Sequence, residues 1–254
     1  MSGPESTEPE FAASPSERPE PQLLAAAWSV HLFTATGAVV GAMALLAIFA
    51  AEWHRAALLM LVAFSIDAVD GTLARRARVS EVIPGFDGRR LDDMVDFFNY
   101  VLVPVVFVVA AGLVGSWLWI VPPILASAYG FSQTDAKTED DFFLGFPSYW
   151  NVVALYLWVL GVSPVAGAAV LTLLSVAVFV PLKYLYPSKA PRLRRTTNGL
   201  GFLWVILFAL AVAFPERTAP FRLAELTLAY PFYYLALSAW LGGWRRPRSA
   251  VATR

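Results

Sequence analysis

The 254-residue chain contains no cysteine. It can therefore form no disulfide scaffold, no cysteine-based zinc site and no thiol nucleophile. Charged residues are scarce as well: they make up 15% of the chain, against about 25% in a typical soluble domain. The 19 basic and 19 acidic residues cancel, so the bulk charge gives no reason to expect a nucleic-acid partner.

Apolar residues take the place of the missing charge. Hydrophobic residues make up 58% of the chain, including 18 Phe and 9 Trp, whereas soluble domains average about 45–50%. They gather in runs that can cross a bilayer as helices, which takes about 20 residues. The sequence therefore predicts an all-α, polytopic membrane helix bundle with eight transmembrane segments, at 32–51, 56–77, 92–113, 115–133, 147–162, 164–182, 199–214 and 226–243.

The distribution of basic residues supports a count of eight. With eight spans both termini lie on one side of the membrane, and of the 19 Lys and Arg residues only Arg55, Arg217 and Arg222 fall on the other side. By the positive-inside rule the basic side is the cytoplasm, so we expect both termini to be cytoplasmic. A six-span core with two re-entrant hairpins is the main alternative.

The ends of the chain differ from its middle. Residues 1–21 are rich in Glu and Pro and have few large apolar side chains, which predicts a disordered tail. Residues 22–30 are expected to form a short interfacial helix before the first span. We therefore expect a single membrane catalytic domain over 22–244, followed by a basic cytoplasmic tail over 245–254.

Four aspartates interrupt the apolar pattern where two neighbouring spans meet the cytoplasm. Asp67 and Asp70 lie at the cytoplasmic end of the second span, and Asp92 and Asp96 lie at the start of the third. Spacings of three and four residues put each pair on one face of its helix. Because a short loop joins the two spans, their helices can lie antiparallel as neighbours, and the four carboxylates can converge.

Four anions in one place need cations, and the sequence offers two kinds. In one interpretation the aspartates form ion pairs with nearby arginines at a solvated helix end. In the other, their hard oxygen atoms bind divalent metal, and four carboxylates on two rigid helices suit a pair of ions about 3.5–4 Å apart. The small residues Gly71, Ala74 and Gly88 favour metal, because they let a bulky ligand approach the helix backbone. Arg75 can bind a phosphate through two parallel hydrogen bonds.

These residues carry a resemblance to a known family. The pattern Asp67-x-x-Asp70-Gly71-x-x-Ala74-Arg75, then Gly88-x-x-x-Asp92-x-x-x-Asp96, resembles the signature of the CDP-alcohol phosphatidyltransferases. The gap over 76–87 is longer than in most members and is typical of the bacterial phosphatidylcholine synthases. The runs HLFTATGA, DDMVDFFNYVLVPVVF and SAYGFSQTDAKTEDDFFLGFPSYWN also resemble that subfamily, so the similarity covers most of residues 31–200.

The resemblance implies a fold, a reaction and a set of residue roles. The fold would be a six-helix family core with extra helices in the bacterial cytoplasmic (inner) membrane, with the active site facing the cytoplasm and homodimers possible. The reaction would transfer the phosphatidyl group from CDP-diacylglycerol to choline and release CMP, with Mn²⁺ or Mg²⁺ as cofactor. The implied metal ligands are Asp67, Asp70, Asp92 and Asp96, with Asp96 also the general base, and the implied cytidine and diphosphate contacts are Gly71, Ala74, Arg75 and Gly88.

Two further groups of residues are weaker candidates. Thr34, on the cytoplasmic half of the first span, is a candidate nucleotide contact, although small residues at helix contacts explain it equally well. A quaternary ammonium is recognised by aromatic faces and nearby carboxylates. Because Trp and Tyr also gather at every membrane interface, each choline-binding candidate has an ordinary alternative explanation; the candidates are Asn99, Tyr100, Tyr129, Tyr149 and Trp150.

Other functions remain open at this point. The acceptor could be glycerol phosphate, inositol phosphate or serine, although a phosphorylated acceptor would need extra Arg or Lys in the pocket. The chain could also be a cation transporter that uses the aspartates as its ion site, but transporters often show inverted repeats, and none is visible. Since no Ser, Cys or His completes a nucleophile–base pair near the aspartates, we expect direct attack by the acceptor hydroxyl, with membrane lipid surrounding the protein.

Overall fold

The computed structural model describes residues 20–133, 142–185 and 193–242. The predicted C-terminal tail and nearly all of the predicted N-terminal tail lie outside these residues. The described part is helical, as expected, with these elements: α1 (Pro21–Phe49), α2 (Trp53–Arg76), α3 (Val79–Val82), α4 (Gly88–Asp96), the π-helix η1 (Phe97–Leu102), α5 (Val103–Ala110), the 3-10 helix η2 (Trp117–Ile120), α6 (Val121–Ser132), α7 (Trp150–Val159), α8 (Pro164–Phe179), α9 (Arg194–Ala213), α10 (Pro215–Thr218), η4 (Ala219–Phe221), α11 (Leu223–Thr227) and α12 (Ala229–Gly242).

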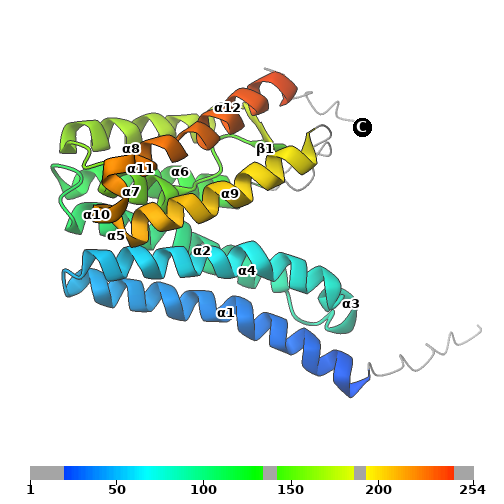
Figure 1. Ribbon diagram of the computed structural model, residues 1–254. Helices are drawn as coiled ribbons and strands as arrows, with labels where there is room; N and C mark the ends of the chain where they lie inside the picture. Colours follow the sequence, from blue (N-terminus) through cyan, green and yellow to red (C-terminus); the bar gives the residue numbers. More distant parts are fainter. Residues whose placement is uncertain (1–19, 134–141, 186–192, 243–254) are drawn as a thin grey trace, which may run out of the picture.

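Four stretches of helix are long and apolar enough to cross a membrane: Pro21–Phe49, Trp53–Arg76, Gly88–Ala110 and Arg194–Ala213. The other four predicted spans coincide with shorter helices, α6, α7, α8 and the pair α11–α12. In Figure 1, α1 and α2 lie side by side, and the start of α1 and the end of α12 point toward the same end of the bundle. That arrangement agrees with the prediction of an even number of crossings.

The expected interfacial helix over 22–30 does not form a separate element. Its residues are the first turns of α1, which is continuous from Pro21 to Phe49 over 29 residues. A helix of this length is about 44 Å long, whereas the hydrocarbon core of a bilayer is about 30 Å thick. Because nothing in the sequence breaks the helix, α1 extends beyond the membrane at one end.

The outside of the bundle is apolar, and several polar side chains are inside. Phe49 is 77% exposed and Leu32 is 68% exposed, whereas Asp70 and Asn99 are buried. Water would make such a surface costly, but lipid covers it at no cost, and polar groups are then best placed between helices. The described part of the chain is therefore a helical membrane protein.

The third long helix changes its winding beside the aspartates. Residues Phe97–Leu102 form a π-helical segment between α4 and α5. Pro104, at the start of α5, has no backbone N–H to give to the turn before it, and π-helical segments relieve such mismatches within a helix. The wider turn buries Asn99 and Tyr100 together, one toward α1 and the other toward α2.

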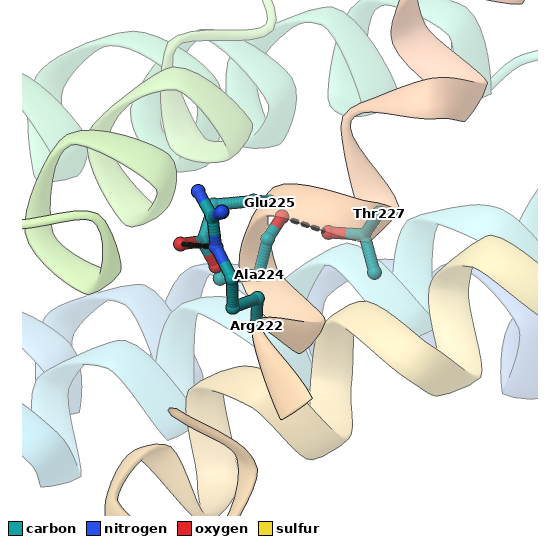
Figure 2. A network of polar contacts seen from close by, with 4 residues as sticks. All are labelled: Arg222, Ala224, Glu225 and Thr227. Atoms are coloured by element: carbon teal, nitrogen blue, oxygen red, sulfur yellow. Dashed lines mark hydrogen bonds and ion pairs between the residues drawn. The ribbon is translucent and has the colours of Figure 1, made fainter. Parts of the chain in front are cut away.

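The last predicted span is interrupted near its beginning. A short helical segment, α11, comes before α12, and Arg222 enters it with a left-handed backbone conformation at φ +49°. Figure 2 shows how this corner is held: the Arg222 Nε donates to Glu225 Oε1 at 3.1 Å, and the Thr227 hydroxyl donates to the Ala224 carbonyl at 2.7 Å. Thr227 also accepts a hydrogen bond from Tyr156 of α7 at 3.0 Å, so the corner is tied to the core.

A short β-ladder adds to the all-α expectation. Strands β1 (Phe142–Leu144) and β2 (Lys183–Leu185) pair antiparallel, with Leu144 opposite Lys183. The ladder packs on α12, where the Tyr234 hydroxyl donates to the Leu185 carbonyl at 2.8 Å. It therefore joins two loops that the sequence treated as separate and ties both to the last helix.

Candidate active site

The structure brings three of the four predicted aspartates together. Asp67 and Asp70 lie on α2 and Asp92 lies on α4, and one carboxylate oxygen from each is within 4.8 Å of the others. The spacing of three residues on α2 accounts for half of this arrangement. The loop and α3 account for the rest, because Val79 and Ile83 pack against Ala27 of α1 and turn the chain back beside α2.

Asp96 and Tyr100 complete the same cluster from one turn further along. The Asp96 carboxyl lies within hydrogen-bonding distance of Asp67, with Asp92 and Asp70 as its next charged neighbours. The Tyr100 hydroxyl donates to Asp67 Oδ2 at 2.5 Å. All four aspartates therefore converge, as the sequence predicted, and Tyr100 lies directly on one of them.

Helix α4 begins where its sequence provides a cap. The Asp87 side chain accepts a hydrogen bond from the Arg90 backbone N–H at 3.0 Å, which is the usual role of Asp at an N-cap position. Asp87 and Asp93 are both exposed, as expected for acidic residues outside the motif. The cap fixes the start of α4 and so the positions of Asp92 and Asp96 along it.

Thr34 contacts the cluster through a ligand rather than standing apart from it. Its side chain is buried on α1 and donates a hydrogen bond to the Asp70 carboxylate. Asp70 also accepts from the backbone N–H of Gly71. The first span thus orients a carboxylate of the second. Whether Thr34 also touches a nucleotide stays a prediction.

The predicted diphosphate residues lie beside the aspartates, with different surroundings. The Arg75 guanidinium is exposed and donates to the Thr72 hydroxyl at 3.1 Å, and its Nη1 lies 3.5 Å from where a side chain on Gly71 would begin. Ala74 packs on the small apolar cluster between α1 and α3. Gly88 lies directly against the His31 ring of α1, a contact that the sequence analysis missed.

Among the choline candidates, Tyr100 and Tyr149 lie together. Their ring centroids are 6.0 Å apart, with the planes tilted by 56°. Tyr149 is just before α7, so its ring reaches the cluster from the other side of the bundle. This pair places two aromatic faces next to Asp67, which is an arrangement that a cationic group favours.

The other three choline candidates have structural partners. The Asn99 amide donates to the Gly37 carbonyl of α1 at 3.0 Å. Trp150 is 1% exposed in the apolar core, and its indole N–H donates to the Ser127 hydroxyl at 2.7 Å. Tyr129 is half-exposed and stacks on Phe179 at 4.9 Å. These contacts hold helices together and are sufficient to explain the three side chains.

Two tyrosines near Tyr149 were missed because they come from distant parts of the chain. The hydroxyl of Tyr234 on α12 is within electrostatic reach of Tyr149 and Tyr184. Tyr184 lies on β2, where burial raises the pKa of its hydroxyl and keeps it protonated. Only the β-ladder brings them together, and no local pattern announces a ladder of three-residue strands.

The donor set of the cluster suits a hard divalent cation. Carboxylate oxygens are the ligands that Mg²⁺ and Mn²⁺ prefer. The 4.8 Å span of the three oxygens is close to the about 4.2 Å that separates oxygens on opposite sides of one Mg²⁺. Among the described residues, no ion pair involves Asp67 or Asp70, and Arg78 pairs instead with Glu81 at 3.6 Å. The geometry therefore fits metal binding better than a purely ion-paired helix end.

Fold and site together define a class: an integral membrane protein with an acidic centre, able to hold a divalent cation, at the adjoining ends of two helices. No protein-family model matches the chain. The chain is 32% identical over 216 residues to a phosphatidylcholine synthase of Borreliella burgdorferi, covering 84% of this chain and 92% of that protein. It is 38% identical over 224 residues to one of Legionella pneumophila, covering 84% and 87%.

A phosphatidylcholine synthase of Bradyrhizobium diazoefficiens is 38% identical over 206 residues, covering 80% of this chain and 77% of that protein. The chain belongs to the phosphatidylcholine synthase family, and so to a family of enzymes. The resemblance found in the sequence is confirmed.

Proposed function

We propose that the protein makes phosphatidylcholine by transferring the phosphatidyl group of CDP-diacylglycerol to choline, with release of CMP. The observation that carries this proposal is the convergence of Asp67, Asp70 and Asp92 within 4.8 Å at the ends of two membrane helices. A site in that place meets a lipid-linked nucleotide, whose acyl chains stay in the bilayer while its diphosphate reaches water. The names of the relatives support choline as the acceptor.

The aspartates would hold a pair of divalent ions, Mn²⁺ or Mg²⁺, with Asp67, Asp70 and Asp92 as ligands and Asp96 as a further ligand. Bound divalent cations would neutralise the diphosphate and the charge that develops on the departing CMP. Thr34 holds the Asp70 carboxylate in place, and Tyr100 does the same for Asp67. These hydrogen bonds fix the directions of the carboxylate oxygens before substrate arrives.

The transfer itself needs a base and an orienting group. The choline hydroxyl oxygen forms a bond to the phosphorus of the phosphatidyl group while the bond from that phosphorus to CMP breaks, and Asp96 takes the hydroxyl proton. Arg75 is placed to bind the diphosphate, since its guanidinium lies exposed over Gly71 and next to Asp70. The attack is direct, so a labelled phosphatidyl-enzyme trapped without choline would contradict this account.

The direct test of the function is a comparison of acceptors. Membranes containing the protein and supplied with CDP-diacylglycerol should incorporate labelled choline into phosphatidylcholine and release CMP in equal amounts. Glycerol phosphate, inositol phosphate and serine should be incorporated far less. Preferential incorporation of another alcohol would overturn the acceptor assignment, and cation uptake into proteoliposomes without release of CMP would favour a transporter.

Tyr149 is expected to contribute to choline affinity. Replacing Tyr149 by Ala removes one aromatic face, worth about 0.5–2 kcal/mol to a bound cation, so the KM for choline should rise roughly 2- to 30-fold. Tyr149→Phe keeps the face and should stay near the wild-type KM, and so should Tyr129→Phe, whose ring lies on Phe179. Steady-state kinetics at saturating CDP-diacylglycerol measure this, and an unchanged choline KM in Tyr149→Ala would place choline elsewhere.

The eight predicted spans and the cytoplasmic position of the site form one topological proposal. Its support is the segregation of basic residues, with both ends of the described helical bundle at the same end in Figure 1. Because the chain lacks cysteine, single cysteines can be labelled without background. Glu52→Cys and Val165→Cys should react with a membrane-impermeant reagent outside intact cells, and Glu81→Cys only after permeabilisation. Protection of Val165→Cys would favour a re-entrant hairpin over two crossings.

A further inference from the structure

His31 is a buried histidine that the proposed chemistry does not use. It lies on α1 and is 6% exposed. Its ring is 4.5 Å from the Phe86 ring and 5.8 Å from that of Trp28, and the latter two are 5.3 Å apart. The three rings form an aromatic bracket, defined as Trp28, His31 and Phe86, at the point where the chain enters α4.

The bracket presses on one residue of α4. A Cβ atom at Gly88 would lie 2.5 Å from the His31 Cε1 and 3.3 Å from its Nδ1, closer than real Cβ atoms approach other atoms. Gly85, three residues earlier in the same segment, has nothing within 4 Å of that position. The glycine at 88 is therefore explained by the His31 ring alone, without any ligand.

The His31 ring acts through its shape. Its Nε2 is buried and has no hydrogen-bond partner among the described residues, and an unpartnered buried nitrogen costs stability rather than adding to it. The ring is nevertheless packed against aromatic faces on two sides and against the α4 backbone on a third. It thus fills the space that sets how closely α4 approaches α1.

We infer that His31 is a positioning residue: its ring, held by Trp28 and Phe86 against Gly88, sets the position of α4 and thereby of the two carboxylates that α4 carries. Asp92 and Asp96 follow Gly88 by four and eight residues, which is about 6 and 12 Å along the helix. A shift at the first residue of such a short rigid helix moves both carboxylates with it. A misplacement of about 1 Å can cost on the order of 100-fold in rate.

The test is a double-variant cycle, and its activity readings depend on the proposed function. Gly88→Ala should lower kcat on the order of 100-fold, because the new methyl group must push α4 away from His31 by about 1 Å. In the His31→Ala background the methyl group has room, so adding Gly88→Ala should cost less than about threefold. The KM for choline should stay within about twofold of wild type throughout, and Gly85→Ala should have no effect.

A second reading does not depend on the reaction. Hydrogen–deuterium exchange of the purified protein should become faster in peptides covering residues 88–96 when His31 is replaced by Ala, with α8 as an unchanged reference. The same 100-fold cost of Gly88→Ala in both backgrounds would show that a ligand requires the glycine, and would overturn the inference. So would unchanged exchange in α4. If Gly88→Ala alone fails to accumulate, recovery of the double variant supports the inference and failure to recover contradicts it. A wild-type protein that makes no phosphatidylcholine would contradict only the proposed function.

Discussion

Replacing Asp96 by Asn is expected to abolish phosphatidylcholine formation while the protein still inserts in the membrane. Asn has nearly the same shape as Asp but cannot accept the proton of the choline hydroxyl. General base catalysis contributes about 10²–10⁴-fold, so kcat should fall by at least about 100-fold. The measurement is labelled choline incorporation per amount of inserted protein.

The matched control for this change is Asp93→Asn. Asp93 lies on the same helix, three residues before Asp96, but it is exposed. Its replacement removes the same charge from α4 and should leave the rate within about twofold of wild type, because an exposed charge is well screened. Equal losses in both variants would show that only the charge of α4 matters. Near-normal activity of Asp96→Asn would remove its assigned role.

Removal of divalent metal is expected to have an equally large effect. Charge stabilisation by bound divalent cations is worth several kcal/mol, and each 1.36 kcal/mol is tenfold in rate. Dialysis against a chelator should therefore lower the rate by at least roughly 1,000-fold, and addition of Mn²⁺ or Mg²⁺ should restore it. The assay is again choline incorporation, measured as a function of the free metal concentration.

Variants of the cluster sharpen this prediction. Asp92→Asn removes one of the three converging carboxylates and should raise the metal concentration needed for half of its own maximal rate. Thr34→Val, which removes the hydrogen bond to Asp70, should do the same to a smaller extent, about 10- to 100-fold. Full activity in excess chelator would contradict a metal-dependent reaction and the interpretation of the cluster.

The convergence of the aspartates could be predicted because few patterns explain it. Acidic side chains are expensive in an apolar helix, so Asp67 and Asp70 stand out against their neighbours in α2. Helical spacing alone then puts each pair on one face. The short loop to α4 leaves antiparallel packing as the simple arrangement, and the structure has it.

The contacts of single aromatic and amide residues could not be predicted in the same way. Trp150 and Tyr149 are adjacent, yet one points into the apolar core and the other toward Tyr100. A Trp that packs in a core and a Trp that lines a pocket look alike in a chain as rich in aromatics as this one. Only the partners distinguish them, here Ser127 for the Trp150 N–H.

The winding of the third helix also depends on distant partners. Asn99 reaches Gly37 on α1, and a side chain at Gly41 would collide with the Asn99 amide oxygen. The π-helical turn is stable because α1 offers this close approach, and no residue within 97–102 indicates it. The same holds for His31, whose importance depends on Gly88 being 57 positions away in the sequence and in contact in the fold.

The most direct test of the central claim is a titration of the purified protein with Mn²⁺, followed by electron paramagnetic resonance. The account predicts saturable binding of divalent ions to the wild-type protein, competition by Mg²⁺, and a large loss of affinity in Asp67→Asn and Asp92→Asn but not in Asp93→Asn. Binding that is equally strong in all three variants, or no saturable binding by the wild-type protein, would contradict it.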